Sequence, residues 1–291
     1  MNKFITRHGS PDPAFIEMAL KSLGVTLPRE EWPTHLQEDY WLCSEKYPIA
    51  VVADGVTLEF VDNTYPDPSG AAAVSKIFCE QALKVLEEKY EQFSQEDLVE
   101  AFRVGNSAVG DYNRAQGRTK DTINYMDHDL FAATAAGIVI KDEVIYWFSL
   151  CDSGVTMFDS QGKTVLATPD GWARMLEHRP KNWDELDRTT RKTITRQTYR
   201  NGVDDRGEPI GYGVVTGEVA AELYLLTGTI PVREVAQIAV YTDGYEPYTK
   251  NQKFMEAAAL ESESVDQLEK ELVAQDPNTY GHERTLVTYK F

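Results

Sequence analysis

The 291-residue sequence is poor in cysteine and has no long apolar run. Its three cysteines, Cys43, Cys79 and Cys151, are odd in number and unrelated in spacing, which argues against both a disulfide framework and a zinc knuckle. No apolar run approaches the ~20 residues of a membrane-spanning helix, and the N-terminal MNKFITRHGS lacks the apolar core of a signal peptide. We therefore expect a cytoplasmic protein without a membrane partner.

Positive charge is also scarce. The chain has 29 Lys and Arg against 47 Asp and Glu, which gives a formal net charge of −18. Such a charge repels polyphosphate, so we expect no nucleic-acid partner. An acidic surplus usually indicates only solubility, but it is also compatible with binding divalent cations, whose natural ligands are carboxylates.

Two common catalytic motifs are missing. Neither CDSG at residues 151–154 nor VTG at 215–217 provides the G-x-S-x-G elbow of a serine hydrolase. The glycine-rich GYGVVTG at 211–217 lacks the Lys-Ser/Thr of a phosphate-binding P-loop. The five histidines show no partner pattern, and each is expected to be structural or exposed. They are His8, His35, His128, His178 and His282.

The periodicity predicts one mixed domain spanning residues 1–291. Apolar stripes at residues 71–90 and 98–112 predict two amphipathic helices. Apolar runs at 131–140, 143–151, 155–158 and 164–167 have the spacing of an antiparallel meander. Residues 11–32 would be a helical insertion, and residues 171–210 a flap.

Basic residues gather in the predicted flap. Residues 171–202 contain eight of the 29 basic residues. One interpretation is a solvated helix of mixed charge, and the other is a flap that meets anionic substrates. The sequence leaves both open.

Two apolar strands end in the same pair of residues. IAVVADGVT at 49–57 delivers Asp54 into a turn at Gly55, and QIAVYTDG at 237–244 delivers Asp243 into Gly244. Asp-Gly at a strand end is more often a plain turn. However, two such strands could bring two carboxylates together, and a hairpin beginning at Asp39 would add a third.

Carboxylates at strand ends, without a Cys-His cluster, indicate hard cations such as Mg²⁺ or Mn²⁺. Two such ions held ~4 Å apart activate water for in-line attack on phosphorus. Phosphate-ester hydrolysis is therefore the reaction that this pattern favours.

Six segments in order resemble the metal-dependent protein phosphatases, the 2C-type serine/threonine phosphatases. The resemblance runs from Gln37 to the C-terminus, and its strength lies in the order and spacing of the segments. They are Glu38-Asp39, VVADGV, SGAAAVSKIFCEQAL, FAATAAGIVIKDEVIYWFSLCDSGVTMFD, AVYTDG and the closing TLVTY.

The resemblance implies an α+β fold, a four-layer α-β-β-α sandwich of two antiparallel sheets flanked by helices. It also implies two Mn²⁺ or Mg²⁺ ions, with a third, weaker one. By position, Asp54 would bridge two metals, the Gly55 carbonyl and Asp243 would bind one each, and Asp39 would hold water. Asp129 matches the acid that helps to bind the third ion. The implied reaction is direct attack of water, without a covalent intermediate.

Four departures from the family pattern stand out. His282 and Glu283 occupy the place of an Asp-Asn or Asp-Asp pair, and either could ligate metal. Asp-Gly-x-Gly becomes Asp54-Gly55-Val56-Thr57, and CDSG replaces Gly-Asp-Ser. The phosphate-binding arginine expected just before Glu38 is missing, and Arg7 would replace it if residues 11–32 are an insertion.

The sequence therefore predicts a Mn/Mg-dependent phosphatase that acts as a monomer on phosphoserine or phosphothreonine in proteins, with small phosphomonoesters also open. The alternative is a pseudophosphatase, a binding module with the same fold and a degenerate metal site. An unrelated metal-binding hydrolase is a third reading.

Overall fold

Ten strands form two antiparallel sheets in the computed structural model, which describes residues 4–23, 37–56, 65–126, 128–258 and 264–291. Parts of the predicted insertion 11–32, and Thr57, lie outside these residues. The β1 sheet has the order β1 (Ile5–Gly9), β10 (Arg284–Lys290), β9 (Gln237–Tyr241), β6 (Gly154–Phe158) and β7 (Thr164–Ala167). The β2 sheet has the order β2 (Tyr40–Cys43), β3 (Ile49–Gly55), β4 (Ala133–Lys141), β5 (Val144–Leu150) and β8 (Leu226–Pro231).

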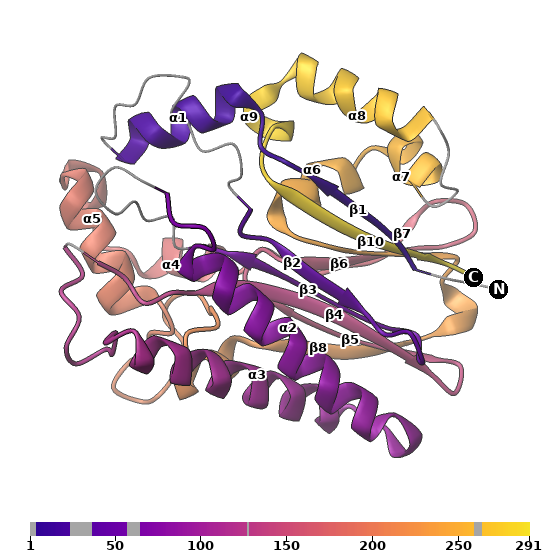
Figure 1. The fold of residues 1–291 in the computed structure, drawn as a ribbon, viewed down its shortest axis with the longest axis horizontal. Coiled ribbons are helices and arrows are strands. Elements are labelled where there is room, and N and C mark those ends of the chain that lie inside the picture. Colours follow the sequence, from indigo (N-terminus) through magenta and orange to yellow (C-terminus); the bar gives the residue numbers. More distant parts are fainter. Residues whose placement is uncertain (1–3, 24–36, 57–64, 127, 259–263) are drawn as a thin grey trace.

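Helices cover the outer face of each sheet, which completes the predicted four layers (Figure 1). The apolar stripes predicted at 71–90 and 98–112 are confirmed as α2 (Gly70–Lys89) and α3 (Glu96–Ala115), which pack on the β2 sheet. The β1 sheet is covered by α6 (Glu246–Thr249), α7 (Gln252–Ala258) and α8 (Ser264–Gln275). The remaining α-helices are α1 (Pro13–Leu23), α4 (Ala173–His178), α5 (Arg188–Ile194) and α9 (Pro277–Tyr280).

The two sheets face each other across an apolar core. Alternate residues of each strand point inward, such as Ala50 and Val52 on β3 and Ile238 and Val240 on β9. This alternation makes the inner faces apolar along most of their length. Polar residues that follow the same alternation at the strand ends must therefore lie between the sheets.

The predicted meander is wrong at one step. Strands β4 and β5 pair as expected, but β6 leaves for the other sheet, where it pairs with β9 and β7. The crossing occurs at Cys151, whose φ of 65° turns the chain between β5 and β6. Because a strand has the same alternating pattern in either sheet, the local sequence cannot distinguish the two pairings.

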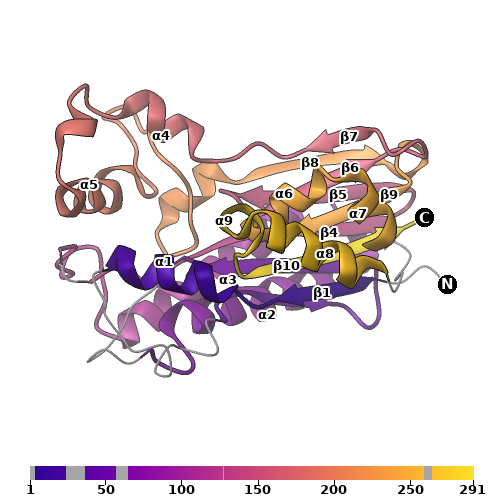
Figure 2. The ribbon, with the colours of Figure 1, turned by 90° about the horizontal axis from the view of Figure 1, so that it is seen from above.

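The predicted flap lies beyond one end of the sandwich. Figures 1 and 2 place α4 and α5 past the strand ends, on the side opposite the two termini. At the same end, β3 finishes at Gly55, β9 finishes at Tyr241 and β10 begins at Arg284. Within the described residues, no helix is both long and apolar enough to cross a bilayer.

Candidate metal centre

Carboxylates replace apolar side chains where the inner faces end. Asp54 follows the inward alternation of Ala50 and Val52 on β3, so its side chain lies between the sheets. Asp39 shares the alternation of Trp41 on β2, whose side chain packs against the same core. The β2 sheet therefore contributes two acids to one end of the sandwich.

The β1 sheet contributes acids to the same end. Asp243 directly follows β9, Glu283 directly precedes β10, and Asp152 lies in the turn that carries the chain from β5 to β6. A cavity of about 270 Å³ lies among these strand ends. It is lined by Pro11, Phe15, Glu38, Asp54, Gly55, Val56, Asp152, Asp243, His282 and Glu283.

The carboxyl groups raise one another's pKa. Burial, followed by the charges of Asp243, Asp39, Asp152 and Glu283, raises the pKa of Asp54 well above its usual value. Burial and neighbouring acids raise the pKa of Asp243 to about 8 and that of Glu283 to about 9. A site of this kind accumulates negative charge that a bound cation would neutralise.

One carboxylate oxygen in the cluster is buried without a partner. The indole Nε1 of Trp172 donates to Oδ2 of Asp152 at 3.0 Å, but Oδ1 has no hydrogen-bond partner among the described residues. A buried carboxylate oxygen without a donor is costly unless a cation approaches it. The residues present thus fit hard cations with oxygen ligands.

Gly55 is required by close packing. A Cβ at this position would lie 2.8 Å from the backbone and side chain of Ala71, in the first turn of α2. The start of α2 is itself bound to the site, because the Glu38 carboxylate accepts hydrogen bonds from Tyr65 and from the N-cap Ser69. The strand end, the helix start and the acids therefore form one rigid unit.

Glu283 and His282 differ in what they contact. The Glu283 carboxylate accepts hydrogen bonds from the backbone N–H groups of Glu38 and Asp39 at 2.9–3.0 Å. His282 donates from Nε2 to the carbonyl of Asn278 at 2.8 Å, and its ring packs 4.2 Å from that of Phe15. Of the two, Glu283 is the side chain that lies within the acidic cluster.

The sequence profile of the family described as Protein phosphatase 2C matches residues 35–275, which is most of the chain. The chain belongs to the protein phosphatase 2C family. No curated protein sequence matches it.

Solved phosphatase structures share the fold of this 2C family member. The serine/threonine phosphatase PstP/Ppp of Mycobacterium tuberculosis superposes with a TM-score of 0.58 at 13% identity, covering 99% of this chain and 97% of that chain. A bacterial serine phosphatase gives 0.57 at 9%, covering 100% and 97%. The catalytic domain of PstP in complex with two manganese ions gives 0.55 at 14%, covering 99% and 97%. At these identities the likeness shows the fold alone.

Arg7 does not reach the acidic cavity of this 2C family member. It pairs with Leu286, on the outer face of the β1 sheet, and its guanidinium contacts Asp266 and Glu269 of α8. The expectation that Arg7 binds substrate at this cavity is therefore corrected. The cavity has no lysine or arginine among its described lining residues.

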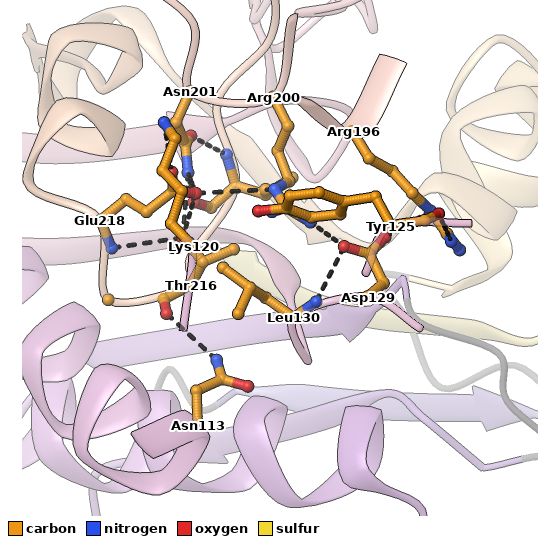
Figure 3. Close-up of polar contacts among 12 residues, drawn as sticks. Asn113, Lys120, Tyr125, Asp129, Leu130, Arg196, Arg200, Asn201, Thr216 and Glu218 are labelled. Atoms are coloured by element: carbon orange, nitrogen blue, oxygen red, sulfur yellow. Dashed lines mark hydrogen bonds and ion pairs between the residues drawn. The ribbon is translucent and has the colours of Figure 1, made fainter. Parts of the chain in front are cut away.

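Asp129, expected to bind a third metal ion, contacts two arginines instead. Arg196 Nε lies 2.7 Å from Oδ2 of Asp129, and Arg200 donates to Oδ1 (Figure 3). Oδ1 also accepts the N–H of Leu130 at 2.8 Å. Asp129 is thus the anion of an arginine cluster, and we do not propose it as a metal ligand.

The flap forms a second cavity beside the first. It has a volume of about 200 Å³ and shares Asp152 and Val56 with the acidic cavity. Flap residues Lys192, Arg196 and Arg200 are among its other lining residues. The basic segment found in the sequence therefore lies next to the acids.

The sequence analysis did not assign Asp152 or His8 to this site. His8 is the neighbour of Arg7 on β1, and it points to the inner face because its partner across the ladder is Thr285. Burial, and then the charge of Arg284, lower the pKa of His8. The sequence signal that could have found His8 is the alternation of β1, which places two adjacent polar residues on opposite faces of the sheet.

Proposed function

We propose that this 2C family member is an active, metal-dependent protein phosphatase that hydrolyses phosphoserine or phosphothreonine. The observation that carries the proposal is the convergence of Asp39, Asp54, Asp152, Asp243 and Glu283 on one end of the sandwich. A chain freed from catalysis has no need to bury mutually repelling acids. The manganese ions of the structurally similar PstP domain support the same reading.

Each acid has a role in this proposal. Asp54, between the two sheets, would be shared by two Mn²⁺ or Mg²⁺ ions, with the Gly55 carbonyl beside it. Asp243, Asp152 and Glu283 would complete the ligand set, and Asp39 would orient water. When bound, the ions supply Lewis acidity for attack of water on the phosphoryl group. The protein fixes the acids on strand ends and keeps the site within a shaped cavity.

A pseudophosphatase is the second candidate. It is favoured by the position of Arg7, which leaves the acidic cavity without an arginine among the described residues. Cationic side chains bind phosphate through charge-assisted hydrogen bonds, and the flap cavity, which shares Asp152 and Val56 with the acidic cavity, carries such side chains. Activity distinguishes the two candidates.

The test is hydrolysis of p-nitrophenyl phosphate in Mn²⁺ and in EDTA, by the wild-type protein and by Asp54→Asn. We expect turnover that requires Mn²⁺ and falls at least about a hundred-fold in Asp54→Asn, because that carboxylate is central to the cluster. Asp142→Asn is the matched control, since Asp142 is 80% exposed in the β4–β5 turn, at the other end of β4.

Two other outcomes of this experiment would change the conclusion. Equal activity in Asp54→Asn and the wild type would refute the metal assignment. Calorimetric Mn²⁺ binding without turnover would instead support the pseudophosphatase. Comparing phosphothreonine and phosphotyrosine peptides then tests the substrate class.

A further inference from the structure

His8 is held rigidly at the edge of the acidic cluster. Its Nδ1 lies 3.1 Å from the hydroxyl of Thr285, and its ring stacks on Trp41 with 5.2 Å between ring centroids and 18° between planes. These contacts come from both sheets, β10 on one side and β2 on the other. The imidazole therefore has a fixed position between the sheets.

Two carboxylates of the cluster lie beside this imidazole. In the described part of the chain, one ligand atom each of His8, Asp39 and Glu283 lie within 4.8 Å of one another. Nitrogen and oxygen ligands lie ~2.0–2.2 Å from ions such as Zn²⁺ and Mg²⁺, so two ligands on opposite sides of an ion lie ~4.0–4.4 Å apart. The three atoms are therefore spaced close to the separation of ligands around one ion.

The two carboxylates are already oriented by other groups. The Thr242 hydroxyl donates to Asp39 at 2.8 Å, and the backbone N–H groups of Glu38 and Asp39 hold Glu283. Partners of this kind fix the direction of the remaining lone pairs, as outer-shell groups do in metal sites. All three potential ligands are thus pre-oriented.

We propose a metal position of the centre whose ligands are His8, Asp39 and Glu283. Because one of these ligands is an imidazole nitrogen, the position prefers a first-row transition-metal ion to Mg²⁺. Imidazole suits transition metals, whereas Mg²⁺ takes oxygen ligands. The proposal rests on the proposed function in that Asp39 and Glu283 belong to the same acidic cluster, and it replaces the water-orienting role of Asp39 with direct ligation. It adds a nitrogen ligand from β1 and predicts which metals the site selects.

The direct test is pulsed electron paramagnetic resonance of the full chain loaded with Mn²⁺. A bound imidazole nitrogen produces ¹⁴N modulation of the Mn²⁺ signal, and labelling histidine with ¹⁵N replaces it with the ¹⁵N pattern. We expect this modulation in the wild type and in His282→Ala, and its loss in His8→Ala. His282 is the matched control because it is the histidine that lines the acidic cavity.

Calorimetry tests the selectivity. In His8→Gln, which retains a hydrogen-bonding side chain, we expect Mn²⁺ affinity to fall about ten-fold while Mg²⁺ affinity changes less than about two-fold. Equal losses for both ions would show a structural effect and overturn the proposal. The labelled wild type needs no substitution, so misfolding of a variant does not affect that arm.

The outcomes separate this proposal from the proposed function. Mn²⁺ binding with turnover but without nitrogen modulation would refute the role of His8 and leave the phosphatase standing. Modulation lost in His282→Ala and kept in His8→Ala would also refute it. Failure to bind any metal would refute both.

Discussion

At the residue scale, the Glu283 carboxylate both binds backbone N–H groups just before β2 and lies among the buried acids. The carboxylate accepts from two backbone N–H groups, that of Glu38, which is shared between both oxygens, and that of Asp39, and these bonds fix the start of β2 against the start of β10. It also lies among acids that raise its pKa to about 9, with burial as the main cause and the charge of Asp39 next. The same side chain therefore joins the two sheets and lines the acidic cavity.

This arrangement predicts different effects for the two residues that occupy the Asp-Asn place of the family. Glu283→Gln should raise the Mn²⁺ concentration for half-maximal activity about ten-fold or more, because the neutral amide is a weaker ligand. His282→Ala should leave it nearly unchanged, since its Nε2 is bound to Asn278. Titrating activity with Mn²⁺ measures both, and the reverse ranking would show that His282 is the ligand.

At the scale of elements, the flap is fastened to the sandwich by a buried polar network. Arg200, 3% exposed, contacts Asp129 in the segment after α3 and lies 3.5 Å from Glu218 (Figure 3). Asn201 donates to Glu218 and to the carbonyl of Val214, each at 3.0 Å. The end of the flap is therefore tied to both neighbouring segments.

Arg200→Met should loosen the flap because it leaves the Asp129 and Glu218 carboxylates with fewer buried partners. Breaking a buried ion pair on one side costs about 3–5 kcal/mol. We expect faster amide hydrogen exchange across residues 195–217, with little change in β3 and β4. Asp129→Asn is the milder control, since its amide oxygen still accepts from one of the two arginines, which contact different oxygens of Asp129, and the contact of Arg200 with Glu218 remains. Unchanged exchange in Arg200→Met would contradict a fastening role.

At the scale of the whole molecule, the acidic centre makes metal-free stability depend on pH. Folding raises the pKa of Glu38 to about 7, of Asp243 to about 8 and of Glu283 to about 9, in each case mainly through burial. A carboxyl whose pKa rises on folding binds its proton more tightly in the folded state. Its contribution to stability is full below the unfolded pKa near 4 and is lost as pH rises through the folded value.

In EDTA, the melting temperature should therefore fall between about pH 6 and pH 9. Each proton bound in excess by the folded state contributes ~1.4 kcal/mol per pH unit. Mn²⁺ binds the deprotonated carboxylates, so saturating Mn²⁺ should raise the melting temperature most at high pH. Differential scanning fluorimetry measures both series. A melting temperature that rises with pH in EDTA would contradict the charge repulsion of the cluster, and Asp243→Asn should flatten the slope.

Much of the centre could be predicted from local sequence. The apolar runs that end in Asp54-Gly55 and Asp243-Gly244 predict strands by themselves, and they place each acid at a strand end. The helical stripes of α2 and α3 also follow from spacing within a single element. The order of these segments indicated the phosphatase family that the profile confirms.

The positions of the other site residues depend on pairing between segments that lie far apart in the sequence. Arg7 and His8 are neighbours in the sequence. The pairing of β1 with β10 places the Arg7 side chain against α8 and the His8 side chain beside Asp39 and Glu283. Asp129 meets Arg200, 71 residues away, and β6 leaves β5 for the other sheet. The sequence by itself determined which acids end strands, because that depends on local periodicity. Only the tertiary structure decided which side chains meet, because a strand's face and partner are set by segments far along the chain.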